Sequence, residues 1–193
     1  MGSLANNVVS NNPRKPRFLC LHGFRTSAEI LKKQVVGKWN PAVVEKLDLV
    51  FVDAPFPCQG KSDVEGLFDP PYYEWFQFNK DFTEYENFDE CLEYIEDYMI
   101  KHGPFDGLLG FSQVSLVPAI LMGVFVIGKE DFLREPGLQL IESCVDPLVI
   151  HHPKGHTIPR FDEKGLEDML SFVERIQKEI NMAEEQIEEQ IVS

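Results

Sequence analysis

The sequence predicts an α/β fold with a doubly wound, mostly parallel sheet, and three observations favour it. A short apolar run leads into Gly110-Phe111-Ser112 and a helix-compatible segment, which is close to the strand–turn–helix bend that presents a nucleophilic serine. An acidic residue, Asp131, and a histidine, His156, each follow a later predicted strand, in the order Ser, Asp, His. A turn at His22-Gly23 ends an earlier apolar strand. Together these pieces predict an α/β-hydrolase-like sheet, whereas Gly-x-Ser alone also fits a serine that only caps a helix.

The length and charge of the chain limit its domain number and its partners. A chain of 193 residues is long enough for one domain with a core. We expect a loose tail at 1–13, a single domain at 14–180 and an acidic helical tail at 181–193. The net charge of −14 argues against nucleic acid and anionic membrane surfaces as partners, because both would repel the chain. No apolar run approaches the roughly 20 residues that a membrane span needs.

The four cysteines favour buried free thiols over a metal or redox site. They are far apart in the sequence and form no Cys-x-x-Cys pair, so zinc and dithiol sites have no support. Free thiols are typical of a reducing compartment. We therefore expect a cytosolic protein, with the nucleus as a further expected compartment.

The first predicted elements are two buried strands with a helix between them. Residues 17–21 form the first strand, and Ser27 is a suitable N-cap for a helix at 27–38. Residues 47–52 form the second strand, which ends at Asp53. Ligands gather at such strand ends in a doubly wound sheet. We nevertheless interpret Asp53 as structural, because it precedes the serine in the chain.

Aromatic residues dominate the segment from 55 to 88, which has little periodicity. Five of the seven residues from 72 to 78 are aromatic. We interpret Tyr72, Tyr73, Trp75 and Phe76 as a wall over an apolar substrate, which favours an acyl or alkyl chain. The alternative is that these rings fill a core edge left uncovered by a missing helix.

The chain around Ser112 is unusually short after the serine. An amphipathic helix is predicted at 88–102, and a strand then rises to Ser112. Only residues 113–123 separate the serine from the next strand at 124–127, close to the minimum of about 10 to 12 residues for a crossover. The strand at 124–127 must therefore lie directly beside the strand of Ser112 or leave a gap in the sheet. The first arrangement would bring Asp131 one strand spacing, about 4.8 Å, closer to the serine.

The last third of the chain supplies the candidate base. Its predicted elements are a helix at 132–144, a strand at 145–152 and a helix at 162–191. Asp146 competes with Asp131 for the acid role, but the position of Asp131 directly after a strand fits better. His151, His152 and His156 lie close together, yet no acidic or sulfur ligand stands nearby at helical spacing, so we expect no metal. His156 is the candidate base because it follows a strand beyond the acid.

Four sequence runs carry a resemblance to a known family. They are FLCLHGF at 18–24, PPYYEWF at 70–76, GFSQ at 110–113 and HHPKGH at 151–156. They closely resemble the family of serine hydrolases, a eukaryotic group that includes the ovarian cancer-associated protein 2-like esterases, and plant members look nearest. The resemblance covers about residues 14 to 180. It implies a cytosolic carboxylesterase that acts on a small-molecule ester without a cofactor.

The resemblance also implies roles for the turn after the first strand. The backbone N–H groups of Phe24 and Gln113 would hold the oxyanion of the tetrahedral intermediate. His22 and Gly23 would border the substrate pocket. We interpret His22 as a turn residue that bonds the loop backbone, because it lies on the wrong side of the serine in the sequence to be the base.

Two features depart from the family pattern. The segment after the serine is several tens of residues shorter, and Val114 stands where the pattern has glycine, so that its branched side chain crowds the turn. An internal deletion explains both, and it leaves two functions open. One is a hydrolase of esters or thioesters that uses Ser112, His156 and Asp131. The other is a catalytically impaired remnant that binds a ligand or a protein, with uncovered apolar surface that favours a homodimer.

Overall fold

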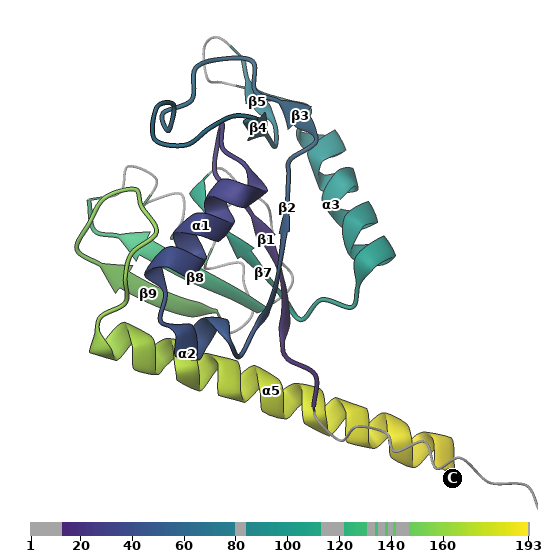
Figure 1. Cartoon of the computed structure of the whole chain (residues 1–193). Coiled ribbons are helices and arrows are strands. Elements are labelled where there is room, and N and C mark those ends of the chain that lie inside the picture. The colour runs from purple at the N-terminus through teal and green to yellow at the C-terminus, as the bar shows by residue number, and fades with distance from the viewer. Residues whose placement is uncertain are drawn as a thin grey trace, which may run out of the picture.

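The computed structural model describes residues 13–79, 84–112, 122–130, 134, 138, 141 and 147–192, and within them the molecule is built on a five-stranded sheet. The strand order is β2-β1-β7-β8-β9, and every neighbouring pair is parallel (Figure 1). The bounds are β1 (Arg17–Leu21), β2 (Asp48–Val52), β7 (Gly107–Gly110), β8 (Met122–Gly128) and β9 (Leu148–His152). Because the strands are parallel, their carboxyl ends all meet at one edge of the sheet. The predicted fold class is confirmed.

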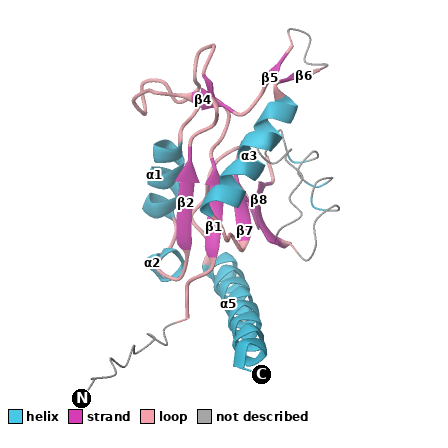
Figure 2. Ribbon diagram, turned by 90° about the vertical axis from the view of Figure 1, so that its right-hand side faces the viewer, coloured by secondary structure: helices cyan, strands magenta, loops and turns pink. Residues whose placement is uncertain are grey.

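Helices cover both faces of the sheet (Figure 2). The helices whose bounds fall within the described ranges are α1 (Ala28–Lys38), α2 (Pro41–Val44), α3 (Phe88–His102) and α5 (Glu163–Val192). Residues of α1, α2 and α5 share one core cluster, whereas α3 contributes Cys91 and Ile95 to a second cluster. Successive side chains of β1 point to opposite faces of the sheet, so Cys20 belongs to the first cluster and Leu19 to the second. Strands β1, β2 and β7 are therefore covered on both sides, as is usual in parallel sheets.

Strand β8 lies directly beside β7, which is the first of the two arrangements expected. Gly107 is in register with Met122, and Leu108 with Gly123. A connection between adjacent parallel strands can be shorter than one that passes over an intervening strand position, so the length of residues 113–121 is sufficient. These residues lie outside the described part of the chain. Most of the helix expected at 132–144, and residues 1–12 of the tail expected at 1–13, also lie outside it.

Local sequence signals account for the helix bounds. Ser27 caps α1 with its side chain, and Asp53 accepts a hydrogen bond of 2.7 Å from the N–H of Ala28 in the first turn. Asp162 accepts from the N–H of Gly165 at 2.8 Å where α5 begins. Among the described residues, no helix joins enough length to enough apolar character to cross a membrane.

A group of short strands above the sheet was not expected from the sequence. The two pairs are β3 (Phe56–Pro57) with β4 (Tyr73–Glu74), and β5 (Gln77–Phe78) with β6 (Tyr85–Glu86). Two-residue strands are too short to give an alternating pattern. In Figure 1, β3, β4 and β5 lie beyond the carboxyl ends of β1 and β2, which is the edge at which sites form in such sheets.

Candidate active site

Ser112 lies on a strained turn at the carboxyl edge of the sheet. It follows β7 by two residues, and its φ of +66° is left-handed, a region that residues other than glycine rarely adopt. The N–H of Phe111 donates to the carbonyl of Leu21 at 3.2 Å, which holds the chain against β1 up to the turn. Strained backbone of this kind at the end of a strand is typical of a nucleophile elbow.

His156 approaches the hydroxyl of Ser112 from the loop after β9. Its Nε2 lies 2.8 Å from the Oγ of Ser112, although the two residues are 44 positions apart in the sequence. The ring stacks on Phe111 at a centroid distance of 4.8 Å and an interplanar angle of 25°. With the proton on Nδ1, the Nε2 lone pair can accept the hydroxyl proton. The geometry is that of a nucleophile beside a general base.

The turn after β1 packs directly against Ser112. A Cβ placed on Gly23 would lie 3.1 Å from the Cβ of Ser112 and 3.2 Å from the ring of Phe111. Such contacts are tighter than most real ones, so a larger residue at position 23 would press on Ser112 and Phe111. The backbone of the Gly23 turn is thereby brought beside the candidate nucleophile.

His22 is fully buried and bonded to backbone at both ring nitrogens. Its Nε2 accepts from the N–H of Ala54 at 3.0 Å, so the proton lies on Nδ1, which donates to the carbonyl of Gly23 at 2.8 Å. Burial lowers the pKa of His22, because the charged imidazolium would lose its hydration. These contacts match the turn role expected from the sequence. With no exposed area, the ring does not itself line an open pocket.

The aromatic segment is divided between core and surface. Trp75 and Phe76 are fully buried in the second core cluster, to which α3 contributes. The indole N–H of Trp75 donates to the carbonyl of His22 at 2.8 Å. This differs from the expected pocket wall, because packing beneath the turn buries both rings completely. Tyr72 and Tyr73 are half-buried and keep exposed area.

Asp131, Asp146 and Gln113 lie outside the described residues, but their described neighbours are informative for the acid. The N–H of Lys129 donates to the carbonyl of His152 at 2.9 Å. A Cβ on Gly155 would lie 3.4 Å from the carbonyl oxygen of Glu130. The loop that carries His156 therefore packs against the end of β8, next to the position of Asp131 in the chain.

Two nearby residues escaped sequence reasoning. Phe111 stacks on His156, and Lys38 donates to Thr157 Oγ1 at 3.1 Å and to the carbonyl of Ile158 at 2.7 Å. Phe111 is the middle residue of the Gly-x-Ser run, so its position next to Ser112 in the sequence could have indicated that it lies at the site. Lys38 gives no such signal, because its contacts are about 120 residues away in the sequence.

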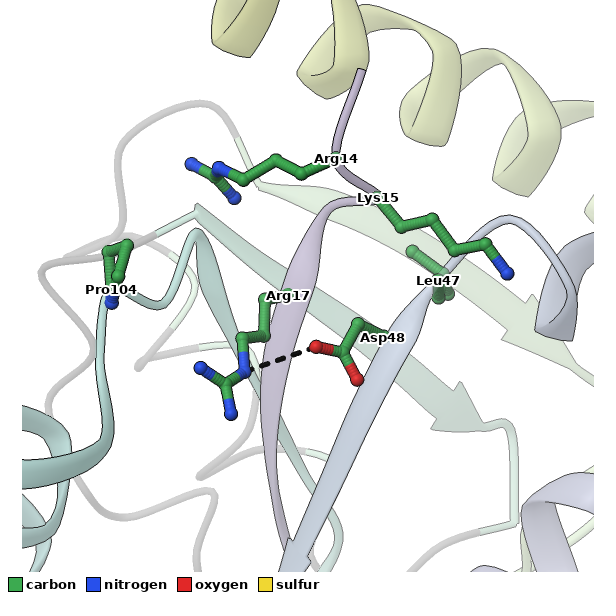
Figure 3. A pocket seen from close by; sticks show the side chains of 6 residues that line it. All are labelled: Arg14, Lys15, Arg17, Leu47, Asp48 and Pro104. Carbon is green, nitrogen blue, oxygen red and sulfur yellow. Dashed lines mark ion pairs between the residues drawn. The ribbon is translucent and has the colours of Figure 1, made fainter. Parts of the chain in front are cut away.

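A hollow lies at the edge of the sheet formed by the amino ends of the strands, away from Ser112 (Figure 3). Its volume is about 410 Å³, and its lining comes from the amino ends of the strands: Arg14, Lys15, Arg17, Leu47, Asp48 and Pro104. Arg17 pairs with Asp48 at 3.1 Å, and Arg14 pairs with Asp106 at 2.6 Å. Both guanidinium groups in the hollow are thus already paired with carboxylates. Among the described residues, no group of three or more side chains is arranged to hold a metal ion.

Comparisons with known proteins place this geometry in context. A family model described as "Serine hydrolase (FSH1)" matches residues 10–125. Rhodanese-like domain-containing protein 6 of Arabidopsis thaliana is 30% identical over 155 residues, which cover 63% of this chain and 25% of that protein. Esterase FUS5 of Gibberella fujikuroi is 33% identical over 113 residues, which cover 56% of this chain and 48% of the esterase. The chain thus spans half or less of the length of these relatives.

Solved structures agree on the fold. A variant of Arabidopsis thaliana SOBER1 superposes with a TM-score of 0.52 at 17% identity, covering 84% of this chain and 99% of the other. A carboxylesterase from Mesorhizobium loti gives a TM-score of 0.50 at 13% identity, covering 84% and 88%. At these identities the likeness concerns the fold alone.

Proposed function

Because the chain belongs to the serine hydrolase (FSH1) family, we propose that it cleaves carboxylic esters by way of Ser112, His156 and Asp131. The observation that carries this proposal is the 2.8 Å contact between Ser112 Oγ and His156 Nε2. A serine oxygen on a strained turn, within hydrogen-bonding reach of an imidazole, is the arrangement that nucleophilic acyl transfer requires.

The first half of the reaction forms an acyl-enzyme. Ser112 Oγ attacks the ester carbonyl while His156 Nε2 takes its proton. The tetrahedral intermediate then collapses, and the alcohol leaves with the proton from the imidazolium. In the second half, His156 takes a proton from water, which attacks the acyl carbon and releases the carboxylic acid. Ser112 regains its proton from His156.

Asp131 is the proposed orienting carboxylate. It would accept a hydrogen bond from His156 Nδ1, fix the tautomer and stabilise the imidazolium. Support comes from the packing of Gly155, one residue before His156, against the carbonyl of Glu130, one residue before Asp131. Strands β7, β8 and β9 are adjacent, so Ser112, Asp131 and His156 each follow one of three neighbouring strands.

The N–H groups of Phe24 and Gln113 are the proposed donors to the oxyanion. The close approach of Gly23 to Ser112 supports the first donor, because it brings the turn that contains Phe24 to the reacting serine. Preorganised backbone donors of this kind supply a large share of the rate of acyl transfer.

The proposed substrate is an ester or thioester with an apolar acyl or alkyl chain. Half-buried Tyr72 and Tyr73 can offer apolar surface near the turn, since the N–H of Tyr73 donates to the carbonyl of Thr26 at 2.7 Å. FUS5 of Gibberella fujikuroi, one of the relatives, is described as an esterase. The free thiols of Cys20, Cys58 and Cys91 fit a reducing compartment such as the cytosol.

A fluorophosphonate probe tests the proposal directly. We expect covalent labelling of the wild-type protein and none of Ser112→Ala. His156→Ala should label at least about a hundredfold more slowly, because it lacks the general base. Ser171→Ala is the matched control, since Ser171 is an exposed serine on α5, and it should label like the wild type.

Hydrolysis of p-nitrophenyl esters from acetate to decanoate would then define the chain length that the site accepts. Folded wild-type protein that neither labels nor hydrolyses any of these esters would contradict the proposed activity and support a non-catalytic binding role.

A further inference from the structure

We propose that Arg25 and Glu74 act as a positioning pair that holds the turn carrying the N–H of Phe24 in its catalytic geometry. The proposal rests on the proposed hydrolase function and assigns a role to two charged residues that the reaction itself does not use. Neither residue is proposed to touch the substrate.

The pair is an ion pair with one fully buried member. Arg25 Nε lies 2.7 Å from Glu74 Oε1, and the side chain of Glu74 has no exposed area, whereas that of Arg25 is 30% exposed. Glu74 Oε1 also accepts a long hydrogen bond of 3.4 Å from the N–H of Gln59, and Oε2 has no hydrogen-bond partner among the residues that the structure describes. A buried carboxylate is unfavourable without a close cation. Arg25 is therefore drawn firmly to Glu74.

This attraction acts on the residues next to Phe24. The backbone of Arg25 is left-handed, with a φ of +52°, immediately after Phe24 and two residues after Gly23. The guanidinium also lies over the Phe24 ring, 4.6 Å from its centroid, a favourable cation–π distance. Both the ring and the following peptide of Phe24 are thus restrained by one side chain.

The groups that hold Arg25 in place belong to segments outside the turn. Arg25 Nη1 donates to the carbonyl of Lys61 at 3.1 Å, and the hydroxyl of Ser62 donates to the carbonyl of Arg25 at 2.6 Å. A Cβ on Gly60 would lie 2.5 Å from Arg25 Nη1, so the guanidinium fits against bare backbone there. Glu74 belongs to β4, which pairs with β3 above the carboxyl edge of the sheet (Figure 1). The turn is therefore tied to β4 and to the 60–62 segment, in addition to the strand β1 from which it continues.

Loss of this anchor should affect the transition state more than the ground state. An oxyanion donor acts only when its hydrogen lies close to where the negative oxygen forms, and removal of such a donor lowers kcat by about 10²–10³. A misplaced donor loses part of that effect. We expect kcat to fall roughly 10- to 100-fold, with KM changed less than about threefold, because binding of the acyl chain uses other contacts.

The informative variant is the double substitution Arg25→Met/Glu74→Leu. Arg25→Met alone leaves a buried unpaired carboxylate and can unfold the protein, whereas the double variant removes both charges and is expected to keep its fold. We expect near wild-type thermal unfolding and the predicted fall in kcat on a p-nitrophenyl ester. Affinity for an alkyl boronic acid, which mimics the tetrahedral intermediate on Ser112, should fall in parallel with kcat/KM. Arg25→Lys, which keeps the charge but not the planar group, should be intermediate.

Arg14→Met is the matched control. Arg14 forms an ion pair of similar length with Asp106, but at the amino ends of the strands. It should leave kcat and boronic acid affinity unchanged. A double variant with wild-type kcat, or one whose activity falls only with its folded fraction, would overturn the positioning role while the hydrolase function stands. Wild-type protein without activity would overturn both.

Discussion

At Ser112 the chain accepts a backbone conformation that costs about 1–3 kcal/mol for a residue other than glycine. The φ of +66° turns the hydroxyl away from the strand direction and toward the loop of His156. Gly23 makes room on the other side, where any larger residue would press on Ser112 and Phe111. Single residues thus set the distances on which the proposed chemistry depends.

His22 predicts a specific dependence of stability on pH. Its pKa is lowered by burial from the ordinary value of 6.5, so in the range between 6.5 and the lower folded value the unfolded chain binds a proton that the folded chain does not. The free energy of unfolding should therefore fall as pH is lowered through this range. Urea denaturation at pH 7.5, 6.0 and 5.0 measures the effect.

The matched comparison for His22 uses two variants. His22→Asn keeps an N–H near the carbonyl of Gly23 but cannot titrate, so its loss of stability between pH 7.5 and 5.0 should be smaller than that of the wild type. His151→Asn, at an exposed position of β9, should follow the wild-type pH dependence. Equal pH slopes for the wild type and His22→Asn would contradict the buried neutral imidazole.

At the scale of elements, the end of α1 is tied to the segment after His156. Lys38 reaches Thr157 and Ile158 with two hydrogen bonds, and bonds from charged donors contribute about 1.5–3 kcal/mol each. Because Lys38 is only half-buried, solvent weakens these two bonds, so Lys38→Met should lower the free energy of unfolding by about 1–3 kcal/mol in total and slow fluorophosphonate labelling of Ser112. Thermal unfolding and labelling kinetics measure the two effects.

Lys33→Met is the control on the same helix. Lys33 pairs with Glu29 at 3.5 Å between two exposed side chains, and such pairs contribute about 0.3–0.5 kcal/mol. It should change neither stability nor labelling appreciably. If both lysine variants behaved alike, α1 would have no role in holding the His156 loop.

Predictability from sequence differs among the elements for physical reasons. Helix α3 begins and ends at Phe88 and His102 as expected, because an apolar stripe marks its length and Gly103-Pro104 stops it. Helix α2 was missed, since the four residues from Pro41 to Val44 are too few to show a helical period. The paired short strands were missed for the same reason, and with them the partner of Arg25.

The site was predictable where motif order was enough and not where long-range packing decides. Ser112 and His156 were expected to converge because parallel strands end at one edge, and the structure brings them to 2.8 Å. Trp75 and Phe76 were expected to line a pocket, but contacts with α3 bury them. Asp131 and Gln113 stay predictions. The Arg25–Glu74 pair joins residues 49 positions apart and left no local pattern.

At the scale of the whole molecule, α5 has two parts with different environments. Met169, Phe172, Val173, Ile176 and Ile180 are buried in the core, whereas Met182, Ile187 and Ile191 are exposed. Figure 1 shows the last turns running beyond the sheet. A chain ended after Glu185 should therefore unfold within about 0.5 kcal/mol of the full chain, as measured by urea denaturation.

Ile176→Ala provides the opposite case on the same helix. Ile176 is fully buried, so its truncation should lower the free energy of unfolding by about 2–5 kcal/mol. If removal of residues 186–193 instead lowered the free energy of unfolding as much as Ile176→Ala, the last turns of α5 would have to make stabilising contacts.

The contact between Ser112 and His156 spans three adjacent strands, since β8 separates the strands that precede the two residues. No local fragment of the chain can form it, because the hydroxyl and the imidazole meet only after both strand interfaces have assembled. Reaction with a covalent probe would then report the concentration of native molecules in a mixture. In a refolding experiment, labelling at successive times would therefore measure the fraction of native molecules. Spectroscopic signals from the same sample would average over native and partly folded molecules.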